Sequence, residues 1–72
     1  MAVREVNGVM FNTSNPRTIN GKKFYWNDHS KDKSKLQGMA NQLRGKGFDA
    51  RILPTYERGV IWWTLFIRPR SK

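Results

Sequence analysis

The stretch that decides the fold runs Val60-Ile61-Trp62-Trp63-Thr64-Leu65-Phe66-Ile67. It joins β-branched, aromatic and aliphatic side chains with a single threonine, Gly59 precedes it and Arg68-Pro69 closes it. A helix that crosses a bilayer needs roughly 20 apolar residues, so this stretch is too short to span one. Its length, its β-branching and the flanking glycine and proline favour a strand.

Alternate side chains of a strand point to opposite faces. The pattern therefore predicts an apolar core side made of Ile61, Trp63, Leu65 and Ile67. The opposite side carries Val60, Trp62, Thr64, Phe66 and Arg68. This second set mixes aromatic rings with an arginine, and what covers it is the main functional question.

Charge is the strongest feature of the composition. The chain has 72 residues, with 14 Lys plus Arg against 5 Asp plus Glu and a formal net charge of +9. We expect one domain over residues 1–72, with frayed ends at 1–5 and 69–72. A positive field of this size attracts polyanions, such as nucleic acid, anionic lipid or acidic proteins.

The sequence contains no cysteine, so neither disulfides nor zinc thiolates stabilise the fold. No apolar run is long enough for a signal peptide or a membrane span. We expect a soluble cytoplasmic protein with no membrane partner.

Two Asn-Gly pairs punctuate the first third of the chain. Asn7-Gly8 predicts either a hairpin with a type I′ turn or one bent strand over about residues 6–12. Asn20-Gly21 lies between two candidate strands and is the better hairpin signal. The aromatic run Phe24-Tyr25-Trp26 follows it as a strand, and we expect Phe24 and Trp26 to face the core and Tyr25 to face outward.

A helix is expected over about residues 31–46, after a connection at 27–30. Its apolar residues fall at helical spacing in a single stripe made of Leu36, Met39, Ala40 and Leu43. Ser30 or Asp32 is expected to cap its first turn, and Gly47 to end it in a left-handed conformation. A strand over 48–53 follows, with Phe48, Ala50 and Ile52 inward, and a turn over 54–59.

The expected order is β-β-α-β-β, an α+β fold in which one helix packs on one face of a small antiparallel sheet. The predicted core contains Phe24, Trp26, Leu36, Met39, Ala40, Leu43, Phe48, Ala50, Ile52, Ile61, Trp63, Leu65 and Ile67.

One pattern in the second half resembles known proteins. A basic helix ends in Leu43, Arg44 and Gly47, a strand follows with Ala50-Arg51-Ile52, and the last strand closes with Arg68-Pro69. This pattern resembles small basic proteins of archaea and viruses. The helix-strand-strand half is also similar to half of a SPOR domain, the bacterial module that binds peptidoglycan glycan strands, although SPOR domains carry a second helix that this chain lacks. The matched positions are packing residues, so the resemblance implies the fold only.

Catalytic and metal-binding patterns are sparse. The chain has one histidine and no cysteine, whereas a metal site needs three or four converging ligands. Asp28, His29 and Asp32 form the only local cluster of titratable groups, and the two aspartates suit the N-terminus of a helix. We therefore expect no cofactor and no enzyme activity. A glycan- or phosphodiester-acting enzyme would rest on Asp28 and His29 alone.

Basic residues interleaved with aromatic ones favour a small nucleic-acid-binding protein, for DNA or RNA. The candidate phosphate contacts are Lys31, Lys35, Lys46, Arg51, Arg58, Arg68 and Arg70, and the candidate stacking residues are Trp62, Phe66 and Tyr25.

Alternatives remain open. The aromatic side of the last strand would be covered if the N-terminal segment folded across it. It would also be covered if a partner protein bound there, or if two copies of the chain formed a homodimer through this side. A two- or three-stranded ribbon would instead read duplex DNA through its arginines.

Overall fold

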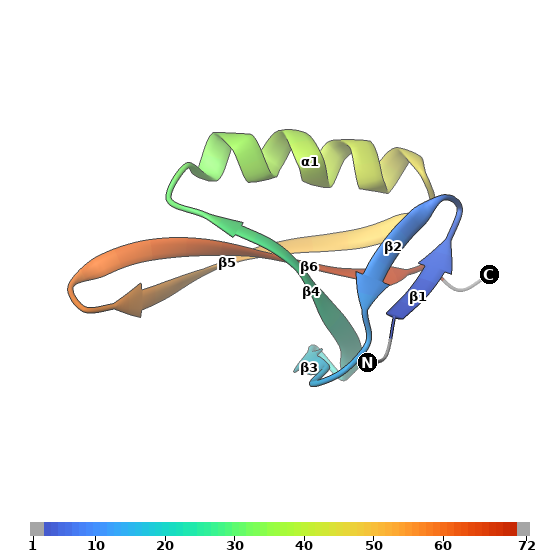
Figure 1. The fold of residues 1–72 in the computed structure, drawn as a ribbon, viewed down its shortest axis with the longest axis horizontal. Helices are drawn as coiled ribbons and strands as arrows, with labels where there is room; N and C mark the ends of the chain where they lie inside the picture. Colours follow the sequence, from blue (N-terminus) through green and yellow to red (C-terminus); the bar gives the residue numbers. More distant parts are fainter. Residues whose placement is uncertain (1–2, 71–72) are drawn as a thin grey trace.

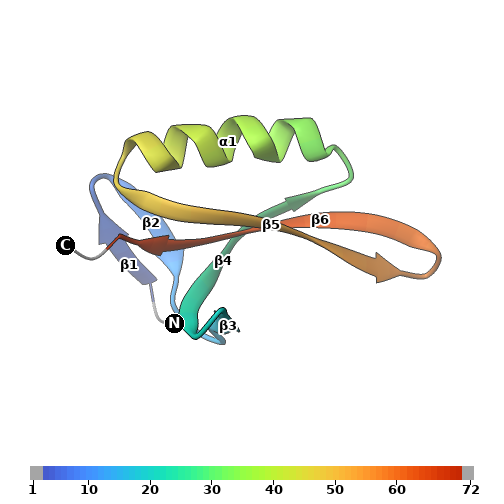
Figure 2. The same cartoon turned by 180° about the vertical axis from the view of Figure 1, so that it is seen from behind.

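The structure, a computed structural model, describes residues 3–70. Its elements follow in chain order as β1 (Val3–Val6), β2 (Val9–Asn12), β3 (Arg17–Ile19), β4 (Lys22–Ser30), α1 (Lys33–Gly45), β5 (Phe48–Glu57) and β6 (Val60–Pro69). Figure 1 shows one helix lying over a twisted sheet, with the β5–β6 hairpin extending beyond the helix as an arm. Figure 2 shows the same layers from behind.

The strands form two antiparallel units. The main sheet has the order β3-β4-β6-β5, and β1 pairs only with β2. The helix packs mainly on β5 and also contacts β4 and β6. The predicted α+β class, with one helix on one face of a small antiparallel sheet, is confirmed. Strands β1 and β3 add to the predicted order, because each Asn-Gly pair closes a hairpin.

The N-terminal hairpin shows how the turn chemistry works. Asn7 and Gly8 have φ values of 51° and 81°, which a type I′ turn requires and which asparagine and glycine tolerate best. Residues 3–5 of the predicted frayed end pair with β2 in this hairpin. At the other end, Pro69 pairs with Phe48 and the Arg70 backbone N–H donates to Gly47 O. Residues 1, 2, 71 and 72 lie outside the described residues.

Strand β6 takes the two faces predicted for it. Leu65 and Ile67 have no exposed surface, and Trp63 packs against the same core cluster. Ile61 is 40% exposed, so its placement in the core is wrong. The physical reason is that the β5–β6 hairpin is longer than α1 can cover, and the start of β6 lies in the arm beyond the helix (Figure 1).

The face assignment within β4 is wrong. Tyr25 pairs with Ile67 and packs on the helix side, whereas Trp26 pairs with Phe66 on the opposite side. Trp26 is 44% exposed, so it is not a core residue. Phe24 is buried, but it lies outside the core cluster. All three residues are aromatic, so the sequence alone does not determine whether Tyr25 or its two neighbours face the helix.

Element boundaries also differ from the predicted ones. Strand β4 continues through the predicted connection, with a register shift between Trp26 and Asp28. Helix α1 begins only at Lys33, because the Asp32 carboxylate accepts from the backbone N–H groups of Ser34 and Lys35 at 3.0 and 3.4 Å. The predicted end at Gly47 is confirmed by its φ of 90°.

The arm is longer than predicted because β5 does not stop at Pro54. It continues to Glu57, and only Arg58 and Gly59 form the turn, with φ values of 52° and 77°. Proline fits here because β5 is an edge strand, where a missing backbone N–H breaks no ladder bond.

The core lies between α1 and the sheet and is completed by the N-terminal hairpin. Its buried members are Phe11, Leu36, Ala40, Leu43, Phe48, Ala50, Leu65 and Ile67. Phe11 was not among the predicted core residues. Its ring meets Phe48 edge-on at 5.8 Å and Tyr25 at 5.6 Å. The hairpin therefore closes the end of the helix-side core and does not fold across the opposite face.

We expect Phe11→Ala to destabilise the protein by about 3–5 kcal/mol, because it removes a buried ring from the core. Met10→Ala is the matched control, since Met10 is the neighbouring residue on β2 and is 66% exposed. It should change the free energy of unfolding by less than about 0.5 kcal/mol. Urea denaturation measures both. Equal effects would show that the hairpin does not pack as described.

Candidate functional site

The face of the main sheet opposite α1 is the candidate site, and we call it the outer face. The strand pairing places side chains from three strands on it: Phe24, Trp26 and His29 from β4, Trp62, Thr64, Phe66 and Arg68 from β6, and Asp49, Arg51, Leu53 and Thr55 from β5. Within residues 3–70, no helix covers this face (Figures 1 and 2).

Three rings on the outer face form a continuous aromatic row. The His29 ring lies 5.7 Å from the Trp26 ring and 5.1 Å from the Trp62 ring, measured between centroids. Trp26 and His29 are exposed and Trp62 is half-buried. The row lines a shallow hollow of approximately 350 Å³, together with Thr55, Glu57 and Thr64. The aromatic row is therefore open to solvent.

Sequence reasoning missed Trp26 because it placed Trp26 on the wrong face of β4, and it missed His29 because of the bulge that follows Trp26. Trp26 and Asp28 pair with Phe66 and Leu65, which are consecutive in β6, so β4 carries one extra residue between them. An extra residue reverses the alternation beyond it. His29 thus shares a face with Trp26, although residues three apart in a regular strand lie on opposite faces. No glycine or proline signals this bulge.

Cations lie over three rings of the outer face, namely Trp62 of the aromatic row and the neighbouring Phe24 and Phe66. The Arg17 guanidinium carbon is 5.5 Å from the Phe66 centroid, and that of Arg51 is 5.8 Å from the Phe24 centroid. The Lys31 ammonium is 5.1 Å from the Trp62 ring. Such contacts lie within the range of cation–π attraction. Of the predicted site residues, the structure thus brings Lys31, Arg51, Trp62 and Phe66 together, and it adds Arg17, which was not among them.

Two predicted phosphate contacts are engaged by a carboxylate instead. Asp49 Oδ2 accepts from Arg68 Nη1 at 3.2 Å, and Asp49 Oδ1 accepts from Arg70 Nε at 3.1 Å. Arg70 Nη2 also donates to Phe48 O at 3.0 Å. These contacts tie β6 and the residue after it to β5. Arg68 and Arg70 therefore have a structural role, and their charge is partly neutralised.

The electrostatics of Asp49 follow from these contacts. Burial by itself would raise the pKa of its carboxyl, but the hydrogen bond and charge of Arg70, with the charge of Arg68, lower that pKa below its ordinary value of 3.8. A carboxyl with a lowered pKa stabilises the fold above the pKa of the unfolded state, and this contribution is lost as the pH falls.

The remaining predicted residues lie away from the aromatic row. Tyr25 is on the helix side of the sheet, against Phe11, so the prediction that it shares a face with Trp62 is wrong. Lys35 is exposed on α1, and Lys46 follows the helix, where its carbonyl accepts from Asn7 Nδ2 at 2.8 Å. Arg58 lies in the turn at the tip of the arm.

The cluster of Asp28, His29 and Asp32 has structural contacts. Asp28 Oδ1 accepts from the backbone N–H of His29 at 2.7 Å, Asp32 caps α1, and the His29 ring contacts two tryptophans. Over residues 3–70, no three His, Cys, Asp or Glu residues converge as metal ligands would. In the same range, the helix is neither long nor apolar enough to cross a membrane.

Comparison of the chain with protein-family models, with curated proteins and with solved structures finds no match. The geometry and charge of the outer face are therefore the features that indicate a function.

We expect Asp49→Asn to lower the thermal midpoint at pH 7, because it removes the carboxylate that holds Arg68 and Arg70. The gap between the native protein and the variant should narrow as the pH falls below 3.8, where the native carboxylate is progressively protonated. Thermal unfolding followed by circular dichroism between pH 7 and pH 2 measures this, and a gap that does not depend on pH would contradict it.

Proposed function

We propose that the protein is a non-enzymatic binding protein for single-stranded nucleic acid, DNA or RNA, and that the outer face is its binding surface. The observation that carries the proposal is the open aromatic row of Trp26, His29 and Trp62, with cations beside Trp62 and the neighbouring rings. Every base has a flat π face, so such a row accepts unpaired bases with little sequence preference.

Stacking supplies the first part of the binding energy. A base that stacks on an exposed aromatic side chain contributes about 1–3 kcal/mol. Trp26 is 44% exposed in the free protein, so a base placed on it would cover apolar surface that is now in water. The hollow beside it is lined by both tryptophans of the row, so a second base would lie against the Trp62 ring, which is tilted relative to its neighbour His29.

Phosphate contacts supply the second part. Arg17, Lys31 and Arg51 lie next to the rings of the outer face, and none of them is paired with a carboxylate within the described chain. The net charge of +9 adds a long-range attraction for polyanions. Binding should therefore weaken as salt rises, because each neutralised phosphate releases counterions.

The arm argues for single strands over duplexes. A two-stranded ribbon fits the major groove, but a reader of duplex DNA needs cations along the ribbon for the phosphates on both sides. The distal arm, residues 54–61, carries one cation, Arg58, and one acid, Glu57. Its charge is balanced, so the cations of the molecule are concentrated away from the tip.

A second candidate function is binding to a protein partner or to a second copy through the outer face. It is favoured by the apolar area of Trp26, Trp62 and Phe66, since exposed apolar patches commonly mark interfaces. In a homodimer of this kind, Arg17, Lys31 and Arg51 of both copies would face each other and repel. Light scattering across concentration separates the two candidates, and a stable dimer with buried tryptophans would favour the second.

We expect Trp62→Ala to weaken binding of an oligothymidylate by roughly 5- to 150-fold, the equivalent of losing one stacked base. Trp26→Ala should act in the same direction. Tyr56→Ala is the matched control, because Tyr56 is 74% exposed but lies on the helix side of the arm. Fluorescence titration with single- and double-stranded oligonucleotides at two salt concentrations measures all four proteins.

Several outcomes would contradict this proposal. Absence of binding at low salt would exclude it, and equal losses for Trp62→Ala and Tyr56→Ala would exclude stacking on the outer face. Tighter binding of the duplex than of the single strand would contradict the proposal that the ligand is single-stranded.

We expect Lys31→Gln to lower both the affinity and its dependence on salt, reducing the slope of log K against log salt by about 1. The control is Lys35→Gln, which removes the same charge from α1, away from the outer face. It should leave the slope nearly unchanged. Equal changes in both variants would show that only net charge matters.

A further inference from the structure

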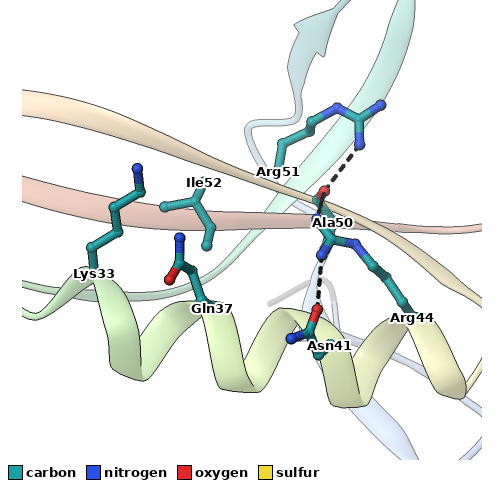
Figure 3. A pocket seen from close by; sticks show the side chains of 7 residues that line it. All are labelled: Lys33, Gln37, Asn41, Arg44, Ala50, Arg51 and Ile52. Carbon is teal, nitrogen blue, oxygen red and sulfur yellow. Dashed lines mark hydrogen bonds between the residues drawn. The ribbon is translucent and has the colours of Figure 1, made fainter.

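A second polar hollow lies between α1 and the free edge of β5, and we call it the edge groove. It has a volume of approximately 350 Å³ and is lined by Lys33, Gln37, Asn41, Arg44, Ala50, Arg51 and Ile52. Figure 3 shows the side chains of α1 rising along one side toward β5. The lining contains three cations and two amides and no carboxylate.

Two arginines meet at a single oxygen atom in this groove. Arg44 Nη2 and Arg51 Nη1 each donate to the carbonyl oxygen of Ala50, both at 3.0 Å (Figure 3). Arg44 reaches it from α1 and Arg51 from the outer face. Because both donors lie so close to one oxygen, the two positive charges are held near each other, and like charges at such distances repel.

The carboxylate nearest in sequence does not offset this repulsion. Asp49 precedes Ala50, but its two oxygens bond Arg68 and Arg70. Arg44 also donates to Asn41 Oδ1 at 3.1 Å, which orients its guanidinium. Each guanidinium carries five N–H donors, so these contacts leave donors for a further acceptor. An anion is the ligand that such a pair of guanidiniums binds best.

The length of the groove identifies the kind of anion. Lys33, Gln37, Asn41 and Arg44 follow one another along a single side of α1. At a rise of about 1.5 Å per residue, the row from Lys33 to Arg44 is about 16 Å long. The row is thus longer than one phosphate ion and fits a ligand that carries more than one phosphate in succession.

We propose that the edge groove binds the phosphodiester backbone of a nucleic-acid strand, and this inference rests on the proposed function. Arg51 connects the two surfaces, because it lies over Phe24 on the outer face and also lines the edge groove. A strand whose bases stack on the outer face passes over the edge of β5, and the following phosphates lie along α1. Lys33, Arg44 and Arg51 contact the phosphates, and Gln37 and Asn41 donate amide N–H groups.

The same arginines also protect the edge of β5. An edge strand offers unpaired backbone groups to another chain, and Arg44 and Arg51 occupy the Ala50 carbonyl. If these arginines only protected the edge of β5, a phosphate ligand would not shift their NMR signals. The experiment therefore measures those signals during titration with a phosphate ligand.

The experiment follows side-chain N–H signals by NMR during two titrations of the intact protein. Tripolyphosphate carries consecutive phosphate anions without sugars or bases, and a short oligothymidylate carries consecutive phosphodiesters together with bases. Both ligands are expected to shift the Arg44 and Arg51 Nε–H signals and the amide signals of Gln37 and Asn41. The indole N–H signals of Trp26 and Trp62 should shift strongly with the oligonucleotide only.

Two variants and one control give the affinities. Lys33→Gln should weaken binding of both ligands by roughly three- to tenfold through loss of one charged contact, and Arg44→Lys should weaken it to a similar extent through loss of a guanidinium hydrogen bond. Arg44→Lys keeps the net charge and tests the planar fork of the guanidinium. Lys35→Gln, on α1 but outside the groove lining, should change neither affinity beyond the uniform effect of one charge. Unchanged melting temperatures confirm that the variants fold.

Each remaining outcome overturns a distinct claim. If the oligonucleotide shifts the indole signals but none in the groove, the edge groove is not a phosphate site and the proposed function stands. If tripolyphosphate shifts the groove signals but the oligonucleotide does not bind, the proposed function fails and with it the assignment of the groove to a nucleic-acid backbone. If neither ligand moves the groove signals, the inference is wrong.

Discussion

The packing of Leu65 and Ile67 under α1 is the constraint on which the rest of the structure depends. Both side chains are fully buried, and β6 is paired on both sides, with β4 and with β5. Because side chains alternate along a strand, burying these two fixes the outward direction of Thr64, Phe66 and Arg68. Any shift of β6 by one residue would place Phe66 and Arg68 in the core.

This constraint divides the charged and aromatic side chains into two groups. On the outer face, rings and cations that cannot enter the core lie side by side, and Asp49 holds Arg68 and Arg70 at one end. On the other side, the stripe of α1 covers the apolar residues of β5 and β6, and its polar flank borders the edge of β5 (Figure 3). One small domain of net charge +9 thus offers an aromatic surface and a basic groove that share Arg51.

The sequence was sufficient to predict features for which only one arrangement buries the apolar side chains. Only one choice of faces for β6 buries an unbroken apolar set, and only one stripe of α1 is apolar. Both predictions are confirmed except at Ile61, which lies in the arm and is 40% exposed. For β4, either set of alternating side chains could face the helix, because Phe24, Tyr25 and Trp26 are all aromatic. The choice depends on Phe11 in the N-terminal hairpin, whose ring packs on Tyr25. The bulge after Trp26 and the extension of β5 through Pro54 also lack a local signal. The Asp49–Arg68 pair follows from the register, and a turn placed at residues 58–59 would have revealed it.

The NMR chemical shifts of the base protons of a bound oligothymidylate show whether its bases stack on the aromatic row. Rings that stack on a base shift its protons upfield, and stacked groups give nuclear Overhauser contacts. We expect upfield shifts of the thymine H6 and methyl signals, with contacts to the rings of Trp26, His29 and Trp62. Binding without such shifts, with contacts from the tryptophan rings to no base proton, would contradict stacking on the aromatic row.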